Sequence, residues 1–168
     1  MPRLGVPPIP SGEGLHGLVV DCSAGGVCAT SFPHLTAVGA TFNRSLFGLL
    51  GRVVGAEARG MKAHTNVWAP DVNLFRDPRW GRGQEVAGED PTLTGAFARS
   101  FVHGMQSGPD SRYLQVVSSP KHAWGYDLED NEPVGRLAFD GNISDQDAVE
   151  YYVRLPMTNC PPVCHLSF

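Results

Sequence analysis

The densest group of residues that could do chemistry lies in the segment 75–91, which reads Phe-Arg-Asp-Pro-Arg-Trp-Gly-Arg-Gly-Gln-Glu-Val-Ala-Gly-Glu-Asp-Pro. Its three cations and four carboxylates are Arg76, Arg79, Arg82, Asp77, Glu85, Glu89 and Asp90. Residue types alone favour a loop whose charges neutralise one another, because ion pairs commonly order such segments. Trp80 supports a second interpretation, a sugar site, since an aromatic ring can pack against the C–H face of a sugar whose hydroxyls bond to charged groups. Both interpretations stay open at this point.

Three candidates for polar chemistry lie elsewhere in the chain. Lys121 and His122 follow a strand-like run, where such a pair is usually a solvated strand end. Glu13 lies in the glycine-rich run 12–17, where a carboxylate is usually exposed. Neighbouring residues of a regular strand point to opposite faces, so Lys121 and His122 can share one pocket only if the backbone departs from that geometry. We expect either a bulge or a non-proline cis peptide bond there.

A phosphate-binding loop is excluded by the charges beside its best match. Gly83 and Gly88 have the G-x4-G spacing, but Glu89 and Asp90 occupy the positions that a lysine and a serine or threonine would need. Two carboxylates there would repel a triphosphate. The net charge of −4 and the lack of a long basic run also make nucleic acid an unexpected partner.

The cysteines and the apolar runs exclude other classes of protein. The four cysteines are Cys22, Cys28, Cys160 and Cys164. Their C-x5-C and C-x3-C spacings are not those of a usual zinc site, so we expect structural or unpaired cysteines and no metal. No apolar run reaches about 18 residues, and the first residues lack the apolar core of a signal peptide. We therefore expect neither a membrane span nor an export signal in this chain.

The elements that must position these residues alternate along the chain. Its 168 residues, 42% hydrophobic and 18% charged, predict one globular domain, and 20 glycines with 14 prolines predict many turns. Strands are predicted at 15–20, at 67–74 with a loop from Pro70, and at 113–117. Strands that alternate with helices favour parallel βα units, in which functional residues gather at the carboxyl ends of the strands.

The first of three predicted helices ends at Gly60. Its apolar stripe consists of Leu46, Leu49, Leu50, Val53 and Val54. These residues repeat with the 3.6-residue period of a helix that packs on one face. Glu57 lies on the same side of this helix, so either its carboxylate has a buried partner or the last turn is exposed. An exposed last turn is the commoner arrangement for a glutamate, and we favour it.

The two later helices have clear start signals. Asp90 can cap a helix and Pro91 suits its first position, after which an apolar stripe repeats every four residues. That stripe consists of Leu93, Phe97, Phe101 and Met105. The run Ser144-Asp-Gln-Asp147 resembles a capping box and predicts a final helix.

Several motifs together resemble glycoside hydrolase family 3, in its β-xylosidase and β-glucosidase branch. The most specific is Arg-Asp-Pro-Arg-Trp-Gly-Arg at 76–82 with Gly-Glu-Asp-Pro at 88–91. Lys121-His122 followed by Tyr126-Asp-Leu is similar to the family's Lys-His motif. Shorter matches lie at 12–17, 29–33, 40–44, 57–59 and 139–152. The resemblance therefore predicts an incomplete N-terminal domain of this family at residues 1–155 and a divergent tail at 156–168.

The resemblance implies an α/β fold, a partial and truncated (β/α)8 TIM barrel, because a complete barrel takes about 250 residues. It also implies a retaining exo-β-glycosidase, β-xylosidase-like, that acts without a cofactor on terminal sugars of plant-type polysaccharides or oligosaccharides. By motif, the residues expected to bind the hydroxyls of the terminal sugar are Glu13, Arg82, Lys121 and His122. Retention requires two carboxyl groups roughly 5 Å apart, a nucleophile and an acid/base, and we expect neither of them in this chain.

Three hypotheses about the chain stay open. It is a piece of a glycosidase that is active only in a longer chain, a sugar-binding module without catalysis, or a nonfunctional truncated product. Carbohydrate is the partner in the first two. The family implies an extracellular location, and the glycosylation sequons at Asn43 and Asn142 agree with it.

Overall fold

The chain has an α/β fold, seen in a computed structural model that describes residues 2–23, 25–122, 125–130 and 133–153. The elements in chain order are η1 Pro2–Leu4, β1 Ser11–Glu13, α1 Leu35–Gly39, α2 Arg44–Gly60, β2 Asn66–Trp68, η2 Gly83–Glu85, α3 Pro91–Gln106, β3 Val117–Ser118, α4 Asp145–Asp147 and η3 Ala148–Val153. Each of the first two strands is followed by a long helix, α2 or α3, before the next strand begins. This confirms the predicted alternation of strand and helix.

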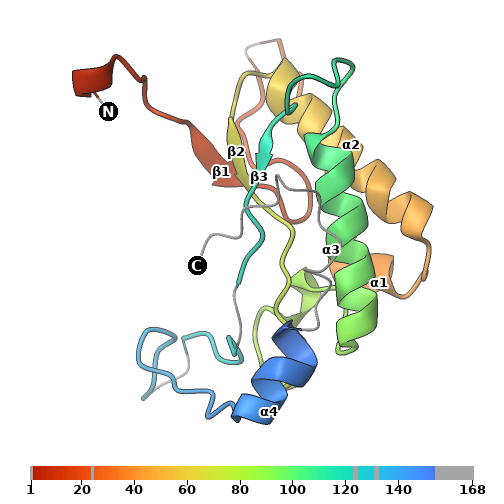
Figure 1. Cartoon of the computed structure of the whole chain (residues 1–168), viewed down its shortest axis with the longest axis vertical. Helices are drawn as coiled ribbons and strands as arrows, with labels where there is room; N and C mark the ends of the chain where they lie inside the picture. The colour runs from red at the N-terminus through yellow and green to blue at the C-terminus, as the bar shows by residue number, and fades with distance from the viewer. Residues whose placement is uncertain (1, 24, 123–124, 131–132, 154–168) are drawn as a thin grey trace.

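The three strands form one parallel sheet in the order β1-β2-β3. Glu13 pairs with Trp68 across β1 and β2, and Asn66 pairs with Val117 across β2 and β3. Helices α2 and α3 lie side by side along one face of this sheet (Figure 1). Because the strands are parallel, their carboxyl ends meet at one edge, where Glu13 and the segment after β3 lie together.

Two of the predicted strands lie in the wrong place. The first strand is Ser11–Glu13 rather than 15–20, and Leu15 and Leu18 are instead buried in the loop that follows it. The third strand is Val117–Ser118 rather than 113–117, and Tyr113 is 68% exposed. Apolar residues mark burial, whereas a strand needs backbone partners, and here β2 supplies them to less apolar segments. The second strand is correct, since β2 ends at Trp68 and the chain passes through a cis Ala69–Pro70 bond into a loop.

Helix α2 begins and ends as its local signals indicate. The Asn43 side chain accepts hydrogen bonds from the backbone N–H groups of Ser45 and Leu46, and the helix ends at Gly60 as predicted. Its buried face is rotated from the predicted stripe and consists of Phe47, Leu50, Gly51, Val54, Gly55 and Ala58. Leu49, a member of the predicted stripe, is 47% exposed.

Glycines explain this rotation, because they bring α2 against α3. A Cβ atom on Gly51 would lie 2.1 Å from the carbonyl oxygen of Phe101, and one on Gly55 would lie 2.3 Å from that of Met105. Only glycine leaves room for such a close approach of two helices. A glycine adds nothing to a hydrophobic pattern, so the pattern points to the wrong side of the helix.

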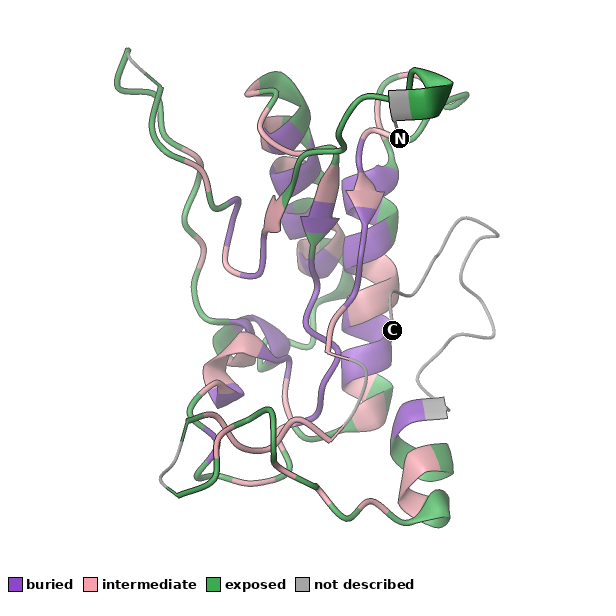
Figure 2. Cartoon of the chain, turned by 90° about the vertical axis from the view of Figure 1, so that its left-hand side faces the viewer, coloured by how far each residue is buried: buried purple, intermediate pink, exposed green. Residues whose placement is uncertain are grey.

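Helix α3 and the start of α4 confirm their predictions. The Asp90 carboxylate accepts from the N–H groups of Thr92 and Leu93, and Pro91 takes the first helical position. Three of the four predicted stripe residues, Phe97, Phe101 and Met105, are at most 1% exposed. They form the core beneath the sheet, seen as the buried side of the helix pair in Figure 2. The Ser144 hydroxyl accepts from the N–H of Asp147 as a capping box requires.

Cys22 and Cys28 form a disulfide bond, so these two cysteines are structural, one of the two expected alternatives. Cys160 and Cys164 lie outside the described residues. Among the helices that the structure describes, none is long and apolar enough to cross a membrane. The described residues also hold no group of three or more histidines, cysteines or carboxylates placed to bind a metal ion.

Candidate functional site

The site forms where the carboxyl ends of the parallel strands meet. Glu13 is the last residue of β1, and Lys121 follows β3 in the chain. The Lys121 ammonium lies 2.6 Å from each carboxylate oxygen of Glu13, although the two residues are 108 positions apart. Lys121 is therefore not a free, solvated strand end. It forms a half-buried ion pair at the edge of the sheet.

The peptide bond between Lys121 and His122 is cis, one of the two departures from strand geometry that were expected. His122 lies against Asp71, whose carboxylate is fully buried. The backbone N–H of His122 donates to Asp71 Oδ1, and Nδ1 of its ring lies 3.1 Å from Asp71 Oδ2. Because a carboxylate only accepts hydrogen bonds, Nδ1 carries the proton and donates it to Asp71. The other ring nitrogen, Nε2, has no hydrogen-bond partner in the part of the chain that the structure describes.

Asp71 is a site residue that the sequence reasoning missed. It forms an isolated parallel bridge with Lys121, just past the end of β2. Its Oδ1 also accepts from the backbone N–H of Asn73 at 2.9 Å, so all its described partners are donors. Its position in the sequence could have identified it, because a polar residue soon after a parallel strand lies at the edge of the sheet where functional groups gather.

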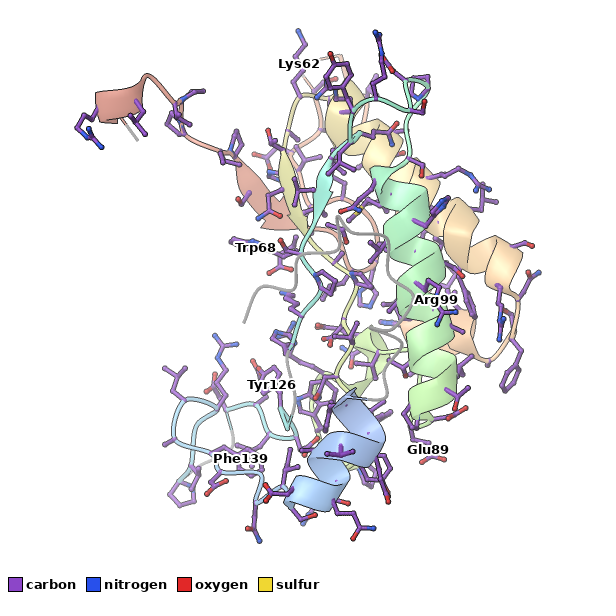
Figure 3. The ribbon with its side chains drawn as sticks, in the orientation of Figure 1. Lys62, Trp68, Glu89, Arg99, Tyr126 and Phe139 are labelled. Carbon is purple, nitrogen blue, oxygen red and sulfur yellow. A yellow bond between two sulfur atoms is a disulfide. The ribbon has the colours of Figure 1, made fainter. Side chains whose placement is uncertain are left out.

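Arg82 joins the same group of residues through Tyr126. Its guanidinium donates to the Glu85 carboxylate, which raises the pKa of Arg82 above its ordinary value. The same guanidinium lies 5.5 Å from the centre of the Tyr126 ring. That ring packs edge-on against the His122 ring, with centroids 4.7 Å apart (Figure 3 labels Tyr126). Tyr126 therefore links two of the four predicted sugar-binding residues, Arg82 and His122, while a direct ion pair links the other two.

A pocket of about 430 Å³ opens beside this group, with Glu13 and Arg82 both in its lining. The loop residues Leu15 to Val19 and Ala29 to Ser31, together with Glu85, form its other walls. Its volume lies within the roughly 300–1,000 Å³ that small-molecule sites occupy. The structure thus brings Glu13 and Arg82 to one cavity, with Lys121 bound directly to Glu13.

Glu57 holds one wall of this pocket from the last turn of α2, which is exposed at Ala56, Arg59 and Gly60 as predicted. Its carboxylate is half-buried and accepts from the backbone N–H of Thr30 at 3.0 and 3.1 Å and from the Thr30 hydroxyl at 2.5 Å. The carboxylate does have a partner, but Thr30 is exposed, so the alternative of a buried partner is wrong. A loop some 27 residues earlier in the chain supplies that partner, which helix periodicity does not reveal.

Trp80 does not offer a face for a sugar, contrary to the second interpretation of segment 75–91. It is 3% exposed and packs edge-on between Phe75 and Tyr126, at centroid distances of 6.3 and 5.4 Å. The ring acts as a core residue under the turn at Gly83, where a Cβ atom would lie 2.1 Å from the Phe75 ring. A tryptophan's role depends on which side of the loop it faces, and that is a tertiary property.

Most charged side chains of segment 75–91 form ion pairs with one another, as expected for a loop whose charges are structural. Arg79 and Asp77 form a bidentate pair, and Arg79 lowers the pKa of Asp77 to about 2. Arg76 reaches out of the segment to Asp127 at 3.4 Å, and burial raises the pKa of that carboxyl despite the cation. The structural interpretation is therefore correct for most of these charges. Arg82 is the arginine of this segment that also faces the pocket.

The sequence profile of the Glycosyl hydrolase family 3 N terminal domain matches residues 2–141, so the chain belongs to glycoside hydrolase family 3. It is 42% identical over 145 residues to β-D-xylosidase 3 of Arabidopsis thaliana, covering 83% of this chain and 19% of that protein. It is also 42% identical over 163 residues to a probable exo-1,4-β-xylosidase of Aspergillus terreus, covering 90% of this chain and 21% of the relative. The chain thus spans about a fifth of the length of the curated relatives it matches.

Solved structures agree with this placement. The exo-β-xylosidase XlnD of family 3, in complex with a xylobiose aziridine probe, superposes with a TM-score of 0.75 at 31% identity over 92% of this chain and 21% of that one. The β-glucosidase 3B of Thermotoga neapolitana, in complex with glucose, gives a TM-score of 0.69 at 32% identity over 78% of this chain and 18% of that one. The matched regions support the α/β fold and the branch of the family that the motifs indicated.

Proposed function

We propose that this chain forms part of the terminal-sugar subsite of a retaining exo-β-glycosidase of the β-xylosidase type, which removes terminal sugars from plant-type polysaccharides or oligosaccharides. The observation that carries the proposal is the contact of Lys121 with Glu13, which lines a pocket together with Arg82. The names of the related proteins from Arabidopsis thaliana and Aspergillus terreus support xylose as the sugar.

The proposed site suits a sugar because it mixes donors and acceptors at one edge. A pair of neighbouring sugar hydroxyls can donate to the Glu13 carboxylate and accept from the Lys121 ammonium, which has a third N–H beyond the two directed at Glu13. Arg82 adds further donors to the lining of the same pocket, whereas His122 is not in that lining and is connected to Arg82 through the Tyr126 ring. Charge-assisted hydrogen bonds of this kind are shorter and stronger than neutral ones, so a few of them fix a sugar's orientation.

None of these residues is proposed as a catalytic residue. A nucleophile must approach the anomeric carbon with a free carboxylate, whereas both Glu13 oxygens are bound to Lys121. We assign the four residues to binding, and we expect both catalytic carboxyl groups to come from outside the described residues.

We further propose that the two βα units and the third strand belong to a (β/α)8 barrel, in which the sugar lies at the carboxyl ends of the strands. The sequential order β1-β2-β3 and the parallel pairing support this arrangement. An extracellular location is also proposed. The Cys22–Cys28 disulfide supports it, because disulfides persist mainly in oxidising compartments.

The test is a titration of the full 168-residue chain with xylose and with glucose, followed by saturation-transfer NMR. We expect xylose binding that weakens at least tenfold in Arg82→Gln and Glu13→Gln. The matched control is Arg79→Gln, because Arg79 belongs to the same loop but its side chain is 86% exposed and pairs only locally with Asp77. Hydrolysis of 4-nitrophenyl β-xyloside by the chain alone is expected to be absent.

The proposal fails if the folded chain binds neither sugar, or if Arg82→Gln and Arg79→Gln bind equally well. Turnover of the xyloside that follows the purified chain would contradict the assignment of these residues to binding alone. Circular dichroism of each variant separates a loss of binding from a loss of fold.

A further inference from the structure

A second pocket of about 410 Å³ lies between helices α2 and α3, away from the strand ends. Three arginines, two serines and a histidine line it, namely Arg44, Arg52, Arg99, Ser45, Ser100 and His103. None of these residues belongs to the proposed sugar site. The lining contains no carboxylate, on a chain whose net charge is −4.

The pocket exists because two glycines let the helices cross closely. A Cβ atom on Gly104 of α3 would lie 2.2 Å from the carbonyl oxygen of Gly48 on α2. Gly48 stands midway between Arg44 and Arg52, four residues from each, and its missing side chain leaves a hollow between them. A Cβ atom built on Gly48 would lie 3.8 Å from Nη1 of Arg52 and 3.5 Å from the Ser100 carbonyl oxygen. Nη1 of Arg52 therefore lies beside this hollow.

The positive charge of the pocket is not neutralised within the described part of the chain. Arg44, Arg52 and Arg99 form no ion pair with any described carboxylate. Five arginines elsewhere do, namely Arg76, Arg79, Arg82, Arg112 and Arg136. Nε of Arg99 is also buried without a hydrogen-bond partner among the described residues (Arg99 is labelled on α3 in Figure 3). The three guanidinium groups therefore lack an anionic partner among the described residues, and an anion in the pocket would supply one.

We propose that this pocket binds a phosphate or sulfate group. Guanidinium groups present N–H donors in a planar fork that matches the oxygens of a tetrahedral oxyanion, and three of them suit a dianion better than a single carboxylate. The positive end of the α2 dipole points the same way, since Arg44 and Ser45 form the first turn of that helix. The Asn43 side chain already accepts from the N–H groups of Ser45 and Leu46, so the arginine and serine side chains are the donors to the ligand.

The volume favours an oxyanion that is carried on a larger molecule. A water molecule occupies about 30 Å³ of liquid volume, so a pocket of about 410 Å³ is larger than one tetrahedral anion needs. A free anion and a phosphorylated or sulfated sugar share the recognised group, and they differ in how much of the pocket they fill.

The experiment measures thermal unfolding of the full chain with sodium phosphate, sodium sulfate or glucose 6-phosphate, at constant ionic strength set with sodium chloride. Binding to the native state raises the unfolding temperature. We expect all three ligands to stabilise the wild-type chain beyond chloride, with affinity at least tenfold lower in Arg52→Gln and Arg99→Gln. The matched control is Arg59→Gln, an exposed arginine on α2 that does not line the pocket and whose replacement leaves the phosphate effect unchanged.

A second measurement needs no variant. In ¹H–¹⁵N spectra of the wild-type chain, phosphate should first shift the amide signals of residues 44–52 and 99–103. If glucose 6-phosphate binds more tightly than phosphate, the ligand is an oxyanion carried on a larger molecule. If the two bind equally, the ligand is the free anion. The proposal is overturned if phosphate acts no differently from chloride at equal ionic strength, if Arg52→Gln and Arg99→Gln bind like Arg59→Gln, or if the shifted amides lie elsewhere.

Discussion

Replacing Asp71 should destabilise the chain and release His122. In Asp71→Ala, three donors lose their acceptor, namely the backbone N–H groups of Asn73 and His122 and the His122 ring at Nδ1. Each buried donor left without an acceptor costs about 1–3 kcal/mol. Asp71 is fully buried, whereas the His122 side chain is 26% exposed, so water recovers part of that cost at the ring. We expect the free energy of unfolding to fall by about 3–5 kcal/mol.

Asp71→Asn keeps the shape and tests the hydrogen bonding separately. Its carbonyl oxygen still accepts from the two backbone N–H groups, while its amide now donates toward the His122 ring. We therefore expect a smaller loss of stability, about 1–2 kcal/mol, and a change of tautomer in which the ring proton moves from Nδ1 to Nε2. Nitrogen-15 NMR of the His122 ring reports this change directly.

The assay is urea unfolding at pH 7, followed by the fluorescence of the three tryptophans, of which Trp80 is buried. Asp110→Ala is the matched control, because Asp110 accepts from the backbone N–H two residues later, as Asp71 does, but its side chain is 45% exposed. An exposed pair of this kind contributes about 0–1 kcal/mol. Two results would show that Asp71 does not hold His122 through these hydrogen bonds. The first is a free energy of unfolding for Asp71→Ala within about 1 kcal/mol of that for Asp110→Ala. The second is a His122 ring that keeps its proton on Nδ1 in Asp71→Asn.

Two further predictions concern helix packing and pH. In urea unfolding, Gly51→Ala should lower the free energy of unfolding by about 1–3 kcal/mol, because its Cβ would lie 2.1 Å from the Phe101 carbonyl oxygen. The control Gly60→Ala should not be destabilised, because a Cβ there meets nothing within 4 Å. Equal effects of the two substitutions would contradict the close contact between the helices. Asp77 should titrate in NMR with a pKa of about 2 and return toward 3.8 in Arg79→Gln. A lowered carboxyl pKa means that the stabilisation by this pair is present above the unfolded value of 3.8 and is lost as the pH falls toward 2, so a midpoint near 3.8 in the wild-type chain would contradict it.

Helix boundaries were predictable because their signals are local. Asp90 and Pro91 start α3 through contacts within the first turn, and Ser144 caps Asp147 in the same way. Gly60 ends α2 as expected. The energies of these contacts depend on neighbours three or four residues away, so a single sequence contains all the partners.

The first and third strands and the buried face of α2 were not predictable from the same pattern. β1 is the polar run Ser11–Glu13, and it is a strand because β2 lies beside it. The contact face of α2 centres on Gly51 and Gly55, which have no side chain to mark a hydrophobic stripe. In both cases a distant segment decides the outcome, and its position is absent from the local sequence.

The sequence by itself determined the family, the alternation of strand and helix, and the residues that we propose for sugar binding, because these reside in short motifs such as 76–82. Only the tertiary structure decided which groups meet. It placed Glu13 against Lys121 across 108 residues, set the buried Asp71 behind His122, turned Trp80 into the core and brought Thr30 to Glu57. Ion pairs and hydrogen bonds act over a few ångströms of space, so their partners are fixed by how the chain folds back on itself, whatever the distance along it.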